Sequence, residues 1–112
     1  MDVQYHNQTV KEQCTNLKRA KRDFPEKVAK KLLRRINLLM SAENLASVIN
    51  FPGVRFHALK GRRLGEYALD IDGARSSYRL IVYFDGYMKQ QVFENSQSIT
   101  IVEVREVSKH YE

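Results

Sequence analysis

Residues 51–59 read FPGVRFHAL, and the hydrophobic period of the chain changes within this stretch. The Pro-Gly pair at 52–53 ends the helical pattern before it, because proline cannot continue a helix and glycine often follows one. After the pair, apolar and polar residues alternate, which is typical of a strand with one buried face. We therefore expect helices before this stretch and strands after it.

Two helices and a short third are expected in the first half. A thin apolar stripe predicts a first helix from about Thr9 that ends before Pro25. Asp23 is expected to cap a second helix, whose apolar residues recur at three- and four-residue spacing up to Met40. Residues 41–49 are expected to form the shorter third helix.

Strands are expected mainly in the second half. The last strand should alternate cleanly, with Glu103 and Val107 on one face and Val104 and Glu106 on the other. Helices followed by a run of antiparallel strands predict an α+β domain with the helices packed across one face of the sheet. Strands are expected at residues 3–5, 54–59, 67–72, 78–84 and 99–107, with a weaker candidate at 92–93.

The composition predicts a single domain spanning residues 1–112. Hydrophobic residues make up 43% of the chain and charged residues 29%, which are ordinary globular values. We expect a cytoplasmic protein without a membrane partner, because no targeting pattern or membrane-length apolar run is present and Cys14 is the single cysteine. The three histidines lack metal-ligand spacing, so neither a metal nor a cofactor is expected.

Positive charge gathers in the first half of the chain. Residues 1–63 hold 14 Lys and Arg against 5 Asp and Glu, a net of +9, whereas residues 64–112 hold 5 against 8, a net of −3. The run 18–35 is either a solvated helix face or a surface that tracks phosphates without reading sequence. The candidate phosphate contacts in this run are Lys18, Arg19, Lys30 and Arg34.

A second group of cations lies between two expected strands, at residues 57–65. Lys60, Arg62 and Arg63 follow His57 there, and glycines on both sides allow a close backbone approach. Three cations at a strand end can converge on one phosphate. The alternative interpretation is an ordinary basic hairpin.

Two further features lie near the end of the chain. Arg79 stands inside an apolar strand, so it must either face a cleft or form a structural salt bridge, for example to Asp70 or Glu66. His110 and Tyr111 follow the last strand. Histidine suits proton transfer near neutral pH, although a chain end is often an idle tail.

These residues together resemble a known family. Residues 55–67, RFHALKGRRLGEY, resemble the H-x-L-K-G-x-R-x-G-x-(W/Y) segment of HigB-type toxins of the RelE/ParE superfamily. Residues 78–80 resemble the following strand of that family, and His110-Tyr111 is similar to its terminal aromatic–histidine pair. The resemblance implies a RelE-like fold, in which two N-terminal helices pack on a curved antiparallel sheet of four to five strands.

The resemblance also implies an activity. HigB-like toxins enter the ribosome and cut mRNA without a metal, and a cognate antitoxin silences them. The implied partners are the ribosome, its mRNA and a helix-turn-helix antitoxin of the HigA type, with operator DNA contacted only through the antitoxin complex. Lys60, Arg63 and Arg79 match positions that the family uses for phosphate contact and catalysis.

Two departures from the family pattern concern the site. His110 precedes Tyr111, whereas many relatives have the opposite order, and Arg62 stands where relatives often carry an aspartate. Either terminal residue could then transfer the proton. Two other functions stay open at this point: a ParE-like toxin that acts on DNA gyrase, and a basic RNA-binding module without enzymatic activity.

Overall fold

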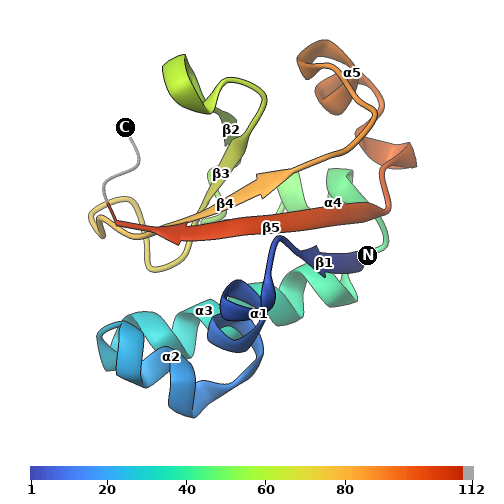
Figure 1. The fold of residues 1–112 in the computed structure, drawn as a ribbon. Helices are drawn as coiled ribbons and strands as arrows, with labels where there is room; N and C mark the ends of the chain where they lie inside the picture. Colours follow the sequence, from blue (N-terminus) through green and yellow to red (C-terminus); the bar gives the residue numbers. More distant parts are fainter. Residues whose placement is uncertain (110–112) are drawn as a thin grey trace.

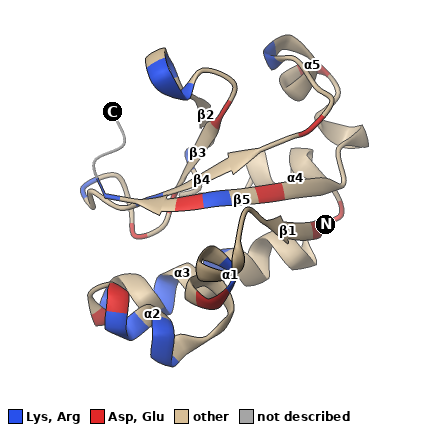
Figure 2. Cartoon of the chain, viewed as in Figure 1, with Lys and Arg blue, Asp and Glu red and all other residues tan. Residues whose placement is uncertain are grey.

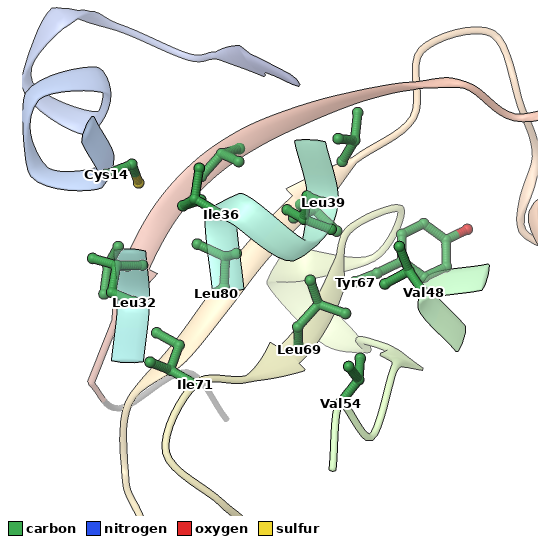
Figure 3. Close-up of a cluster of buried hydrophobic side chains, with 14 of the residues drawn as sticks. Cys14, Leu32, Ile36, Leu39, Val48, Val54, Tyr67, Leu69, Ile71 and Leu80 are labelled. Atoms are coloured by element: carbon green, nitrogen blue, oxygen red, sulfur yellow. The ribbon is translucent and has the colours of Figure 1, made fainter. Parts of the chain in front are cut away.

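Helix α3 (Glu26–Ser41) forms from the apolar stripe that the sequence predicted. In the computed structural model, which describes residues 1–109, Leu32, Ile36 and Leu39 lie fully buried at three- and four-residue spacing. This spacing places them on one face of the helix. Figure 3 shows them beside Leu80 and Leu69 of the sheet, so α3 and the sheet share one core.

The predicted first helix is two helices, which is a correction to the expected count. Helix α1 (Gln8–Thr15) and helix α2 (Leu17–Asp23) are separated at Asn16, whose backbone is extended with φ −123° and ψ 110°. The Oδ1 atom of Asn16 accepts a hydrogen bond from the backbone N–H of Arg19 at 3.1 Å. Asparagine in this position caps the new helix and so favours the break. The expected short third helix is α4 (Leu45–Ile49).

The predicted role of Asp23 as a helix cap is wrong. Pro25 occupies the N-cap position of α3 and makes no side-chain capping bond. The carboxylate of Asp23 instead accepts hydrogen bonds from Gln13 at 3.0 Å and from Nε of Arg19 at 2.7 Å. These bonds, with that from Gln13 first, lower the pKa of Asp23 to about 2. Asp23 therefore ties α2 to α1.

The sheet has five strands in the order β1-β5-β4-β3-β2. The α+β class predicted from the sequence is confirmed. The sheet is mixed, because β1 runs parallel to β5 while the other three pairings are antiparallel. The strands are β1 (Asp2–Tyr5), β2 (His57–Ala58), β3 (Tyr67–Asp70), β4 (Arg79–Tyr83) and β5 (Ile101–Ser108).

The strand predicted at residues 54–59 is much shorter than expected. Only His57 and Ala58 pair with β3. Arg55 adopts a positive φ of 50°, which interrupts the extended backbone before β2. The weak strand candidate at residues 92–93 is also wrong, because these residues lie in helix α5 (Lys89–Glu94).

A bulge in β5 changes the predicted assignment of its faces. Ile81 pairs with Glu106 while the next residue, Val82, pairs with Val104, so β5 holds one extra residue opposite β4. The extra residue shifts the alternation by one position. Val107 is consequently buried in the main core, whereas Glu106 is exposed. The expectation that Glu103 and Val107 share a face is wrong for this reason.

The two sides of the sheet are covered differently. Helices α1, α2 and α3 lie on one side of the sheet, and the 3-10 helix η1 (Gly61–Arg63) rises on the other (Figure 1). On this second side, Leu59, Ala68 and Ile81 form a small apolar cluster of their own. We call this side of the sheet, which carries Leu59, Ala68 and Ile81, the open face. Val92 of α5 belongs to the main core. No helix in residues 1–109 is both long and apolar enough to cross a membrane.

Candidate functional site

The basic segment at residues 57–65 forms the hairpin that joins β2 to β3. The backbone N–H of Leu59 donates to the carbonyl of Glu66 at 2.9 Å, and that of Arg63 donates to the carbonyl of Lys60 at 3.2 Å. Gly61 has a φ of 63°, which favours glycine at the start of the 3-10 turn. We call residues 57–67 the basic hairpin.

The cations of the basic hairpin differ in their surroundings. Lys60 and Arg62 are exposed to solvent, whereas Arg63 is partly buried. Arg63 is bound to two carboxylates, Glu66 at 3.0 Å and Glu106 at 2.5 Å. Its hydrogen bond to Glu106 is the main reason why the pKa of Arg63 is raised. Lys60 and Arg62 are thus the cations of this hairpin that solvent reaches most readily.

His57 has a defined orientation on the open face. It pairs with Ala68 across the ladder, and its side chain therefore lies on the same face as the Ala68 cluster. The Nδ1 atom lies 2.8 Å from the backbone oxygen of Arg55. A carbonyl oxygen can only accept, so Nδ1 carries the proton. In the neutral imidazole the lone pair then belongs to Nε2, the nitrogen that can accept a proton from a substrate.

A chain of alternating charges extends from the basic hairpin across the open face. Glu66 accepts from Arg63 and from Arg105, and Arg105 also contacts Glu103, with distances of 3.0–3.3 Å. The Arg105 guanidinium lies 3.9 Å from the centre of the Tyr83 ring. Figure 2 shows the alternation of acidic and basic residues along β5. Because carboxylates already hold these arginines, an RNA phosphate must compete with them.

Arg79 lies in a buried ion pair, which is one of the two alternatives that the sequence left open. Its side chain is 5% exposed, and its Nε atom lies 3.0 Å from Oδ1 of Asp70. The guanidinium also donates to the backbone oxygens of Ala74, Ser76 and Tyr78. Arg79 therefore holds the connection between β3 and β4 in place.

The candidate cations of the helices are exposed or paired. Lys18 and Arg34 are exposed. Arg19 binds Asp23 and Glu12, and Lys30 binds Glu26 at 3.0 Å. Figure 2 shows basic residues on the outside of α2 and α3, on the other side of the sheet from η1. These cations and the basic hairpin are therefore two separate surfaces.

Sequence reasoning missed a groove of about 670 Å³ at one end of the open face. Tyr83, Tyr87, Ile101 and Arg105 line it, together with Glu103. The alternation of β5 predicted that Glu103 and Arg105 share one face of the strand. The groove itself depends on how the segment after β4 and the segment before β5 fold back, which no local pattern signals.

The structure also bears on residues with metal-binding or nucleophilic side chains. Within residues 1–109, no group of three or more His, Cys, Asp or Glu could hold a metal ion. Cys14 is buried, and its burial raises the pKa of the thiol to about 12. His110 and Tyr111, the expected terminal pair, lie outside the described residues.

Comparison with known proteins does not assign the chain to a family. A scan of the chain against models of known protein families finds no match, and a search of curated proteins finds none either. We therefore infer the function from the residues of the site.

Proposed function

We propose that this protein is a HigB-like toxin that cuts messenger RNA at the ribosome. The observation that carries the proposal is the basic hairpin, in which an oriented His57 on β2 is followed by the exposed Lys60 and Arg62 of the turn. Cations beside a proton acceptor are what phosphodiester cleavage requires. The motif of residues 55–67 that resembles HigB toxins is this same hairpin.

The proposed reaction uses the 2′-hydroxyl of RNA as the nucleophile. Nε2 of His57 accepts the proton of that hydroxyl while its oxygen attacks the adjacent phosphorus. The bond from phosphorus to the 5′-oxygen breaks, and the products are a 2′,3′-cyclic phosphate and a free 5′-hydroxyl. Lys60 and Arg63 stabilise the negative charge that develops on the phosphate. His110 or Tyr111 gives a proton to the leaving oxygen.

Arg79 acts in this proposal as a positioning residue. Its partner Asp70 also binds Arg55, through Nε at 2.9 Å. The carbonyl of Arg55 orients the imidazole of His57. The buried pair of Arg79 and Asp70 therefore supports the histidine through Arg55, which binds Asp70 with its side chain and His57 with its backbone oxygen. Arg79 itself does not contact the phosphate in this proposal.

Dependence on the ribosome follows from the charge chain on the open face. Glu66 and Glu106 occupy Arg63, so free RNA gains little from replacing them. A ribosome that holds the message against the basic hairpin supplies the missing orientation. The outer cations of α2 and α3 would assist docking on ribosomal RNA. A helix-turn-helix antitoxin would silence the protein.

The test is controlled expression of three forms of the protein. Wild type should arrest growth and cut translated messages. Lys60→Ala should do neither, because it removes an exposed cation of the site. Lys89→Ala is the control, since it removes an exposed lysine from α5, outside the basic hairpin and the cations of α2 and α3, and it should behave as wild type. Equal effects of all three forms on growth and on messages would contradict the proposal.

One observation favours a second candidate, the RNA-binding module without enzymatic activity. Arg63 and Arg79, two of the expected catalytic cations, are both bound to carboxylates of the protein itself. That candidate predicts salt-dependent RNA binding with intact messages and normal growth. A gyrase-directed toxin predicts growth arrest with blocked supercoiling and intact messages. The expression experiment therefore separates the three.

A further inference from the structure

A second groove lies between α3 and two connecting segments, those that follow α4 and β3. Its volume is about 370 Å³. The apolar part is made by Leu38, Phe51 and Ile71, and the Phe51 side chain is 47% exposed. Three cations complete it, namely Lys31, Arg34 and Arg35. None of its lining residues in the described chain is acidic.

Cations outnumber the carboxylates near this groove. Asp70 and Asp72 are the nearby acidic residues. Asp70 is already held by Arg55 and Arg79, and Asp72 is held by Lys27 and by Lys31, which is itself one of the three groove cations. The cations available to an incoming anion are therefore Arg34 and Arg35. Arg35 donates from Nε to the backbone oxygen of Asp70 at 2.8 Å, and not to its carboxylate. A half-buried guanidinium in this position gains when a further anion approaches.

The groove continues a basic row along α3. Lys27, Lys31, Arg34 and Leu38 follow one another at three- and four-residue spacing, which aligns them along the helix. An occupant that fits the whole row needs carboxylates opposite the cations and an apolar group at the end near Phe51. An amphipathic protein segment offers both. A nucleic acid strand matches the cations and leaves the Leu38 and Ile71 surface uncovered.

We propose that this groove binds an acidic amphipathic segment of a partner protein, with its apolar side chains against Leu38 and Phe51 and its carboxylates on Arg34 and Arg35. For the proposed toxin, this partner is the antitoxin, and that identification rests on the proposed function. The binding of an acidic segment does not rest on the proposed function, because it involves α3 and its neighbouring segments and none of the residues of the basic hairpin.

The test uses a fluorescein-labelled synthetic peptide as the probe. The peptide is designed to be helical, with glutamates and leucines on one face, and a scrambled peptide of the same composition serves as its control. Fluorescence anisotropy should show saturable binding of the designed peptide and much weaker binding of the scrambled one. Equal binding of the two peptides, or no saturable binding, would overturn the proposal.

Three variants locate the binding site. Arg34→Glu should weaken binding about tenfold, because it replaces an attraction with a repulsion. Phe51→Ala should weaken it about fivefold through lost apolar burial, and a melting curve checks that it folds. Lys18→Glu is the matched control, since it reverses an equally exposed charge on α2, and it should change binding less than about twofold. An equal loss with Lys18→Glu would overturn the proposal.

Single-stranded RNA provides the last arm of the test. Phe51→Ala should leave the binding of an RNA oligonucleotide much less affected than the binding of the peptide, because it removes apolar surface and no charge. If Phe51→Ala weakens RNA and peptide equally, the groove is a nucleic acid surface and the proposal is wrong. Because no RNA cleavage is measured here, failure of this proposal and failure of the proposed function are distinguishable.

Discussion

Replacement of Asp70 by asparagine should destabilise this protein far more than an ordinary surface change. The Asp70 side chain is 2% exposed and contacts Arg79, which is 5% exposed, at 3.0 Å. It also binds Arg55 through both oxygens, at 2.9 and 3.2 Å. Asp70→Asn keeps the shape and removes the charge, and so leaves the buried guanidinium of Arg79 without its counter-ion.

The expected loss in the free energy of unfolding is about 3–5 kcal/mol, the usual cost of breaking a buried ion pair from one side. For a domain of this size, each kcal/mol shifts the melting temperature by about 4 °C, so the midpoint should fall by more than about 10 °C. Urea unfolding followed by circular dichroism measures the free energy of unfolding, and a thermal melt measures the midpoint temperature. The slope of the transition should stay constant if the variant unfolds in two states.

Asp72→Asn is the matched control. It makes the same chemical change two residues away, where the carboxylate binds the more exposed Lys31 and Lys27 at 2.9 and 3.8 Å. Its cost should be about 1 kcal/mol or less. Equal losses for Asp70→Asn and Asp72→Asn would refute the reasoning, since Arg79 would then not depend on a buried counter-ion.

Two further predictions concern charge and protonation. Glu106→Gln should release Arg63 from one of its two carboxylates, Glu66 being the other, and tighten the binding of single-stranded RNA about fivefold, which corresponds to about 1 kcal/mol. Fluorescence anisotropy at fixed salt measures this affinity. Glu43→Gln, an exposed change on the connection from α3 to α4, should leave the affinity unchanged. The pKa of Cys14 is raised from 9.0 to about 12, so the wild type should lose stability relative to Cys14→Ala as the pH rises from about 9 toward 12. Urea unfolding at pH 8 and pH 10 checks the sign, and a constant difference between the two proteins would contradict it.

The sequence predicted those elements whose pattern is local and continuous. Helix α3 follows from a long apolar stripe, and β4 follows from an apolar run. The division of the first helix at Asn16 was missed, because the stripe continues across it and only the asparagine cap marks the break. The bulge in β5 was missed for a similar reason. The alternation looked unbroken, and the extra residue shows only in the pairing with β4.

The candidate site was predictable in part. The sequence indicated a basic turn, and the structure has one at η1. It could not say whether Arg79 meets a carboxylate or a cleft, because Asp70 reaches it only through the register of β3 with β4. The contact between Arg63 and Glu106 joins residues 43 positions apart and has no local signal. The orientation of His57 likewise depends on the turned backbone at Arg55.

Cleavage of a defined message by purified translating ribosomes tests the central claim most directly. The protein, Lys60→Ala and Lys89→Ala are added separately, and primer extension maps the new ends of the message. Wild type and Lys89→Ala should cut at the ribosomal A site and leave a 2′,3′-cyclic phosphate, while Lys60→Ala should be about 100-fold slower or more. An intact message with wild type, or equal cutting by Lys60→Ala, would contradict the account.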